Sequence, residues 1–145
     1  MENTKVLVVE DNQEDAVLTL RGLKRHNVEN KVYVVRDGEE ALDFLFCRNK
    51  YARRDPRDLP QLTLLDIHLP HMNGLEVLRR IRAEERTQDL PIVLLTSSND
   101  QRYMLEGYQS GANSYLEKPV DSTQFMEAIR HVSWYWLELN ATPPK

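Results

Sequence analysis

The sequence has little of what several classes of protein require. Its single cysteine, Cys47, can form no disulfide within the chain and provides no metal cluster. No hydrophobic run approaches the roughly 20 residues of a membrane-spanning helix, and the N-terminus lacks the zones of a secretory signal peptide. Positive charge is not in excess, because 19 Lys and Arg face 23 Asp and Glu. These absences favour a cytoplasmic protein that binds neither membranes nor nucleic acid.

The chain has the length and composition of one globular domain. Its 145 residues are 41% hydrophobic and 29% charged, with a formal net charge of −4. A chain of about 150 residues buries roughly 68–70% of its unfolded surface on folding, which is enough for a core without disulfides. We expect a single domain over residues 1–145, with a core at 4–133 and a helix end and tail at 134–145.

Short apolar runs alternate with segments of helical period. The first four runs are rich in Val, Ile and Leu and do not alternate with polar residues, as is typical of strands buried on both faces. The predicted strands are 5–9, 31–35, 62–65, 91–95 and 113–116. This alternation predicts an α/β fold, a doubly wound parallel sheet with helices on both faces. Such a sheet binds its ligand at the carboxyl ends of its strands.

Each predicted helix follows a short polar residue that can cap its N-terminus. These residues are Asn12, Asp37, Asn73, Asn99 or Asp100, and Asp121. Apolar side chains at helical spacing mark the face that each helix turns toward the sheet. In the fourth helix the expected stripe is a weak one, formed by Met104, Tyr108 and Gly111.

The carboxyl ends of the predicted strands carry three carboxylates, a hydroxyl group and an amine. Glu10 and Asp11 follow the first strand, Asp66 the third and Lys118 the fifth, while Thr96 ends the fourth. Three carboxylates in one crevice repel one another, and either protonation or a divalent cation such as Mg²⁺ relieves the repulsion. We favour the cation. A carboxylate that attacks a phosphoryl group needs its charge shielded, and Lys118 and Thr96 would share that task with the metal.

Each of these residues also has an ordinary structural interpretation. An aspartate at a strand end often caps a helix, Glu10 and Asp11 can form a solvated loop, and Thr96 with its neighbours can form a turn. The functional interpretation depends on all of them meeting at one edge of the sheet.

Four segments, in this order, resemble the receiver domain of two-component response regulators. They are VVEDN at 8–12, LLDIHLPHMNG at 64–74, LLTSS at 94–98 and SYLEKPVD at 114–121. The resemblance extends over about residues 4–133. It implies a flavodoxin-like five-stranded sheet of order 2-1-3-4-5 and phosphorylation by a sensor histidine kinase.

The resemblance also implies a role for each residue of the crevice. Asp66 would accept the phosphoryl group. Asp11 and Asp66 would bind Mg²⁺ through their side chains, His68 through its backbone carbonyl and Glu10 through a water molecule. Glu10 stands where an aspartate is common in the family. His68 and Ser98 occupy positions that would influence the lifetime of the phosphorylated state.

The remaining residues of the pattern imply a switch. Lys118, joined to Pro119 by an expected cis peptide bond, would pair with the phosphoryl oxygens. Thr96 would move toward the phosphate and Tyr115 would turn inward, which would change the surface that a partner contacts. The domain would catalyse only its own phosphorylation and dephosphorylation, and would not be an enzyme in the usual sense.

The segment at 50–60 lengthens the connection into the third strand. Its arginines, Arg53, Arg54 and Arg57, are interleaved with aspartates, which predicts a solvated loop rather than a nucleic-acid-binding patch. A long loop here and an aromatic end to the last helix resemble the small response regulators that pair with phytochrome-type histidine kinases.

Three aromatic residues, Trp134, Tyr135 and Trp136, stand near the end of the last predicted helix. Trp136 continues the apolar stripe, but Trp134 lies about 200° from Val132 around the helix axis and faces away from the core. Exposed aromatic residues are enriched at protein interfaces. We therefore expect a homodimer through this region, with local packing against 143–144 as the alternative.

Three rival functions fit the sequence less well. A Mg²⁺-dependent aspartyl phosphatase of the haloacid-dehalogenase type carries a DxD pattern after the first strand, where this chain has Glu10-Asp11-Asn12. A flavodoxin-like nucleotide binder needs Gly, Ser and Thr donors in that loop. A receiver-like scaffold that is never phosphorylated would not need the complete residue set.

Because only six residues follow Leu139, too few for an output domain, we expect the domain to act through protein contacts or onward phosphotransfer.

Overall fold

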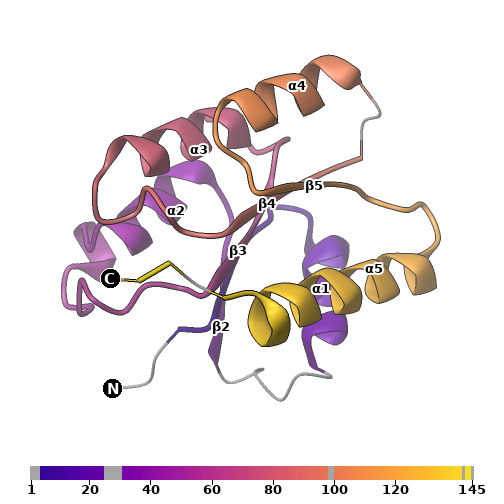
Figure 1. The fold of residues 1–145 in the computed structure, drawn as a ribbon, viewed down its shortest axis with the longest axis horizontal. Helices are drawn as coiled ribbons and strands as arrows, with labels where there is room; N and C mark the ends of the chain where they lie inside the picture. Colours follow the sequence, from indigo (N-terminus) through magenta and orange to yellow (C-terminus); the bar gives the residue numbers. More distant parts are fainter. Residues whose placement is uncertain (1–3, 25–30, 98–99, 142, 145) are drawn as a thin grey trace.

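The computed structural model describes residues 4–24, 31–97, 100–141 and 143–144. Within them the chain forms one five-stranded parallel sheet of order β2-β1-β3-β4-β5 (Figure 1). The strands are β1 (Val6–Val9), β2 (Val32–Val35), β3 (Leu62–Asp66), β4 (Ile92–Thr96) and β5 (Ser114–Glu117). Each predicted strand is confirmed to within one residue at either end, and so is the predicted strand order.

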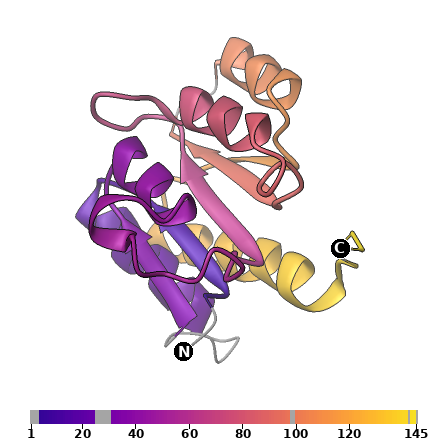
Figure 2. The ribbon, with the colours of Figure 1, turned by 90° about the vertical axis from the view of Figure 1, so that its left-hand side faces the viewer.

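Helices cover both faces of the sheet. They are α1 (Gln13–Leu23), α2 (Gly38–Leu45), α3 (Gly74–Ala83), α4 (Gln101–Gln109) and α5 (Ser122–Trp134), with a 3₁₀ turn η3 (Asn49–Tyr51) and a π-helical turn η4 (Tyr135–Leu139). Helices α1 and α5 lie on one face, and α2, α3 and α4 on the other (Figure 1). Figure 2, turned by 90°, also shows α3 and α4 together on one side of the strands and α5 on the other.

The two faces of β1 supply two separate hydrophobic clusters. Leu7 and Val9 pack with buried residues of α2 and α3, whereas Val6 and Val8 pack with residues of α1 and α5. Every residue of β1, β3 and β4 is buried, while the edge strands β2 and β5 are partly exposed. A strand covered on both sides has no polar face, which explains the continuous apolar runs in the sequence.

The predicted helix caps are confirmed. In each helix the side chain of the residue before the first turn accepts a hydrogen bond from a backbone N–H group of that turn. The capping residues are Asn12, Asp37, Asn73, Asp100 and Asp121. The alternative start at Asn99 lies outside the described residues.

The expected apolar stripe of α4 is wrong. Met104 and Tyr108 are exposed, and Gly111 lies beyond the end of the helix. The buried residue of α4 is Gly107, where a Cβ atom would lie only 2.6 Å from Leu94 Cδ1. Because the helix approaches β4 through a glycine, its larger apolar side chains are not needed for the contact and remain on the surface.

The segment at 50–60 is only partly the solvated loop that the sequence predicts, because Arg53 is exposed but Arg54 is not. The side chain of Arg54 is only 15% exposed, and its guanidinium group lies 3.7 Å from the centre of the Phe44 ring. It donates hydrogen bonds to the backbone carbonyls of Phe44, at 2.5 Å, and Asp58, at 2.6 Å. Arg57, by contrast, is exposed. A guanidinium group offers five donors in a fixed fork, so one buried arginine can satisfy several carbonyls of an irregular segment.

Tyr51 also anchors this segment. Its ring packs edge-on against Phe44, with 5.2 Å between the ring centres, and its hydroxyl group donates a hydrogen bond of 2.5 Å to Glu40. The segment is therefore bound to α2 by both aromatic and polar contacts.

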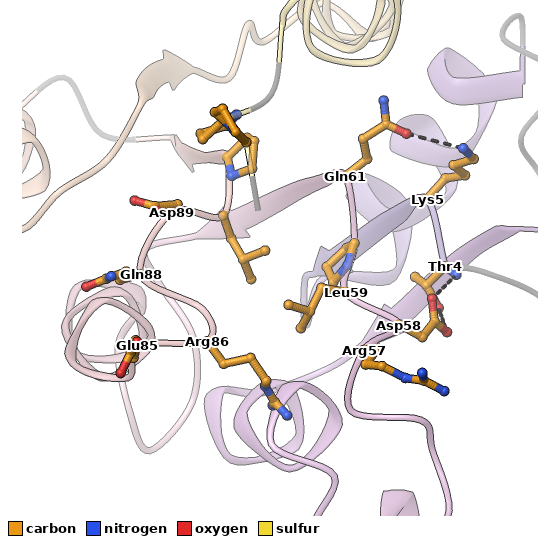
Figure 3. A pocket seen from close by; sticks show the side chains of 15 residues that line it. Thr4, Lys5, Arg57, Asp58, Leu59, Gln61, Glu85, Arg86, Gln88 and Asp89 are labelled. Carbon is orange, nitrogen blue, oxygen red and sulfur yellow. Dashed lines mark hydrogen bonds between the residues drawn. The ribbon is translucent and has the colours of Figure 1, made fainter.

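A pocket of about 620 Å³ opens at the amino-terminal end of the sheet (Figure 3). It lies between the segment before β3, the connection from α3 to β4, and residues 143–144. Charged side chains of both signs line it, among them Lys5, Asp58 and Asp89.

In the described part of the chain, no helix is both long and apolar enough to span a membrane.

Candidate functional site

A buried ammonium group lies at the carboxyl end of the sheet, bound by three carboxylates. Lys118 Nζ is 2.7 Å from Glu10 Oε1, 2.8 Å from Asp66 Oδ2 and 2.8 Å from Asp15 Oδ2. A lysine ammonium has three N–H donors, and here each one has a separate carboxylate acceptor. The side chain of Lys118 is 7% exposed, so these bonds form largely out of contact with water.

The strand order brings these residues together. Val9 and Leu65 are partners in the β1–β3 register, so Glu10 and Asp66, one residue further along, are neighbours. Lys118 directly follows β5, and its backbone N–H donates a hydrogen bond of 2.7 Å to the carbonyl of Thr96 at the end of β4. The sequence-predicted residues Glu10, Asp66, Thr96 and Lys118 therefore converge on one edge, as expected for the carboxyl ends of parallel strands.

Gly74 allows the start of α3 to pack against Asp66. A Cβ atom at position 74 would lie 2.2 Å from the backbone oxygen of Asp66, far closer than any real contact. The N–H group of Gly74 donates a hydrogen bond of 2.8 Å to Ile67 O. Only glycine fits here, so the Asn-Gly pair at the start of α3 helps to place the Asp66 backbone.

The charges of the site perturb one another. Burial, with the neighbouring Asp66 carboxylate, raises the pKa of Glu10 to about 8, although Lys118 acts in the opposite direction. Burial lowers the pKa of Lys118, but the charge of Asp66 and the hydrogen bonds that Lys118 donates to Asp15, Asp66 and Glu10 outweigh it, so the pKa rises overall. At neutral pH and without a cation, the crevice therefore holds a charged lysine and a largely protonated Glu10.

Three of the acidic side chains could hold a metal ion. Glu10, Asp11 and Asp66 each offer a carboxylate oxygen, and these oxygens lie within 4.8 Å of one another. Glu10 and Asp66 are buried and Asp11 is exposed, so the group opens toward solvent on one side. An all-oxygen, acidic donor set suits a hard divalent cation such as Mg²⁺ or Mn²⁺. The residues present therefore fit the predicted metal.

His68 contacts Asp66 from the loop after β3. Its backbone N–H donates a hydrogen bond of 3.0 Å to Asp66 Oδ1, the carboxylate oxygen that does not contact Lys118. Its ring lies edge-on against Tyr103, with 5.2 Å between the ring centres. The expected role of its carbonyl as a metal ligand stays a prediction.

Thr96, at the end of β4, and Tyr115, in β5, interact with each other. Thr96 is completely buried, and Tyr115 packs against the core from β5. The hydroxyl group of Tyr115 is buried without a well-formed hydrogen bond. Burial raises the pKa of Tyr115, and an interaction with Thr96 partly offsets the rise. The tyrosine is thus turned inward in this structure. Ser98, the other predicted determinant of lifetime, lies outside the described residues.

Two features of the site differ from the sequence-based expectation. No peptide bond between described residues is cis, so the expected cis bond before Pro119 is wrong. The trans form is intrinsically preferred even before proline. Asp15 was not predicted as a member of the site. An acid in the first turn of a helix is explained by its favourable interaction with the helix dipole. The sequence therefore gives no separate signal for the contact of Asp15 with Lys118.

Of the aromatic residues at the end of α5 and in η4, the two tryptophans are oriented as predicted. Trp134 and Tyr135 are exposed, at 51% and 47%, whereas Trp136 packs against the same cluster as Val132. The orientation is confirmed, and the homodimer stays a prediction.

Comparison with known proteins identifies the family. The family model for the response regulator receiver domain matches residues 6–130. The chain belongs to the response regulator receiver family.

Similar receiver proteins are known both from sequence and from structure. The chain is 35% identical to the probable methanogenesis regulatory protein FilR2 of Methanothrix harundinacea, over 95% of this chain and 86% of that protein. It is 31% identical to response regulator Rcp1 of Synechocystis, over 95% of this chain and 92% of that protein. The crystal structure of the phosphorylated cyanobacterial phytochrome response regulator RcpA superposes with a TM-score of 0.90 at 30% identity, covering 99% of this chain and 100% of that one.

Proposed function

We propose that this receiver domain accepts a phosphoryl group on Asp66 from a sensor histidine kinase, in the presence of Mg²⁺. The observation that supports this most is the contact of 2.8 Å between Asp66 Oδ2 and Lys118 Nζ. Asp66 is also one of three carboxylates, with Glu10 and Asp11, whose oxygens are close enough to share a cation. A nucleophile, a cation site and a buried ammonium group thus occupy one crevice.

In the proposed reaction an Asp66 carboxylate oxygen forms a bond to phosphorus. The bond from phosphorus to the donor atom breaks, and its electron pair leaves with the donor, which is a histidine nitrogen in a kinase. Lys118 exchanges its bond to Asp66 for bonds to phosphoryl oxygens and so stabilises their charge. Mg²⁺, held by Glu10, Asp11 and Asp66, would supply further positive charge beside the same oxygens. The domain would catalyse only this self-phosphorylation and its reversal by water.

The proposed switch uses Thr96 and Tyr115. A phosphoryl group on Asp66 adds charge and acceptor oxygens, and the Thr96 hydroxyl group would donate to one of them. Tyr115 also contacts α4. Its ring lies close to Gly107, and 6.4 Å separates the centre of its ring from that of the Tyr108 ring. A change in the Thr96–Tyr115 contact would therefore reach the surface of α4, which exposes Met104, Leu105 and Tyr108.

A phytochrome-type kinase is the proposed donor. Solved structures titled as a phosphorylated cyanobacterial phytochrome response regulator and as a bacteriophytochrome response regulator match this chain at 30% and 40% identity, with TM-scores of 0.90 and 0.76. Another match, at a TM-score of 0.88, is titled as the Mn²⁺-bound form of response regulator Rcp1. The Mn²⁺-bound structure supports a divalent cation in the proposed reaction of this receiver.

The proposal can be tested with acetyl phosphate as a small donor. We expect one phosphoryl adduct by intact-protein mass spectrometry with Mg²⁺, and none after chelation. Asp66→Asn should abolish the adduct, whereas Asp89→Asn, an exposed carboxylate at the other end of the sheet, should not change it. If neither acetyl phosphate nor a panel of kinases gave an adduct, the unphosphorylated scaffold would be the better account.

A further inference from the structure

Asp15 binds the same ammonium group as the two carboxylates at the strand ends. Its Oδ2 atom lies 2.8 Å from Lys118 Nζ, across 103 residues of sequence. It comes from a helix rather than a strand end, and its side chain is 28% exposed against 6% for Asp66. Asp15 therefore contacts Lys118 from a different element, the helix α1, whereas Glu10 and Asp66 stand at strand ends.

The backbone of Asp15 is firmly held. Its N–H group donates a hydrogen bond of 2.9 Å to the capping side chain of Asn12, and its carbonyl accepts one of 2.8 Å from the fully buried Thr19 hydroxyl group. An aspartate side chain has only two rotatable bonds, so a fixed backbone places its carboxylate within a narrow region.

Asp15 differs from the other two partners of Lys118 in what else it can bind. Among the described residues, the acidic group close enough to share a metal consists of Glu10, Asp11 and Asp66, and Asp15 is not in it. Under the proposed function, Asp66 becomes esterified and Glu10 is drawn to a cation. Both then change partner during the reaction. Asp15 is the carboxylate that can keep its bond to Lys118 throughout.

We propose that Asp15 is a positioning residue, which holds the Lys118 ammonium group in reach of the phosphoryl oxygens while Asp66 and Glu10 change partners. The proposal rests on the proposed function of Asp66. Lysine is a point charge on a flexible four-carbon stem, so its ammonium group needs a fixed acceptor to remain in one place once two of its three partners are lost. Asp15 does not touch the transferred group and acts through Lys118 alone.

The first test is the rate of phosphorylation by acetyl phosphate. Asp15→Asn keeps the shape of the side chain but removes its charge, and we expect the maximal rate to fall by about 10- to 100-fold, the range for a misplaced reacting group. Mg²⁺ affinity should stay unchanged, since Asp15 is outside the metal group. Glu14→Gln is the matched control, because Glu14 is an exposed acid in the same helical turn. It should leave the rate unchanged.

A double-mutant cycle separates positioning from a general electrostatic or structural effect. If Asp15 acts through Lys118, Asp15→Asn should slow phosphorylation in the native protein and have no further effect in Lys118→Ala. An equal loss in both backgrounds, or no loss in the native protein, would overturn the proposal. Thermal unfolding of each variant with Mg²⁺ identifies any that is simply unfolded.

A second readout does not need phosphorylation. The Lys118 ammonium protons, buried and bonded to three carboxylates, should exchange slowly with water and give a ¹⁵N–¹H signal that disappears in Lys118→Ala. We expect Asp15→Asn to weaken or abolish this signal, whereas Glu14→Gln should preserve it. An unchanged signal in Asp15→Asn would overturn the positioning role even if Asp66 were never phosphorylated. Absence of phosphorylation with loss of the signal would instead contradict the proposed function alone.

Discussion

Lys118, at the carboxyl end of the sheet, and Arg54, before β3, are both cations whose side chains are largely buried, and their surroundings differ. Lys118 is bound by three carboxylates. Arg54 is bound mainly by two backbone carbonyls and the face of the Phe44 ring. Carboxylates can take up a proton, bind a metal or become esterified, whereas carbonyls and rings cannot. The first environment can change with chemical state, whereas the closest contacts of the second cannot; the Asp58 carboxylate lies further away, 3.5 Å from Arg54 Nη2.

Removal of the first cation should have the largest effect. Lys118→Met leaves Glu10, Asp15 and Asp66 without their common counter-charge, and we expect the rate of phosphorylation to fall by about 10²–10³-fold, as for loss of one preorganised charge. Rates measured with acetyl phosphate and saturating Mg²⁺ check this. A rate within threefold of the native protein would show that Lys118 is only structural, like Arg54.

Removal of the second cation should affect folding instead. Arg54→Met leaves the carbonyls of Phe44 and Asp58 without a donor, and we expect the free energy of unfolding to fall by about 3 kcal/mol. Arg57→Met, at an exposed arginine of the same segment, should change it by less than about 0.5 kcal/mol. Urea unfolding checks both. Two results would contradict this difference between the cations. One is an equal loss of free energy of unfolding in Arg54→Met and Arg57→Met, and the other is a much slower phosphorylation of folded Arg54→Met than of the native protein.

The two ends should also differ in their response to pH. The pKa of Glu10 is raised from 4.5 to about 8 in the folded protein without metal, so between these values the folded state binds more protons than the unfolded state. Stability should therefore decrease as pH rises from about 5 to 8, by at most about 1.4 kcal/mol per pH unit.

Urea unfolding in the presence of a chelator, repeated across this pH range, measures the decrease. Glu10→Gln should flatten it, and Arg54→Met should lower stability without changing its slope. A native protein whose stability is constant or increases with pH would contradict the assignment to Glu10.

The smallest effect on stability should come from the exposed end of α5. Trp134→Ala removes a side chain that is 51% exposed, and we expect the free energy of unfolding to change by less than about 0.5 kcal/mol. If the homodimer forms through this region, the same variant should dissociate at higher concentration in analytical ultracentrifugation. Equal self-association of the native protein and the variant would place any dimer elsewhere.

The comparison also explains what the sequence can predict. Glu10, Asp66, Thr96 and Lys118 follow from position alone, because parallel strands bring their carboxyl ends to one edge, and each residue stands at the end of an apolar run. The helix caps follow from local chemistry that involves residues two to three positions apart. Information of this kind is contained in short stretches of sequence.

Other features depend on contacts that no local pattern contains. Asp15 reaches Lys118 across 103 residues, from a helical position that also suits an acid for local reasons. Arg54 stands in a charged segment typical of solvated loops, and its burial depends on where Phe44 lies. The exposed apolar residues of α4 result from close packing at Gly107, since a glycine carries no hydrophobic signal.

The most direct test of the central claim is to locate the acyl phosphate. Borohydride reduction converts a phosphorylated aspartate to homoserine, which peptide mass spectrometry can assign to a position. After incubation with a phosphorylated sensor kinase and Mg²⁺, we expect homoserine at position 66 and at no other acidic residue. Homoserine elsewhere, or none at all, would contradict the proposal that this crevice is a phosphoryl acceptor.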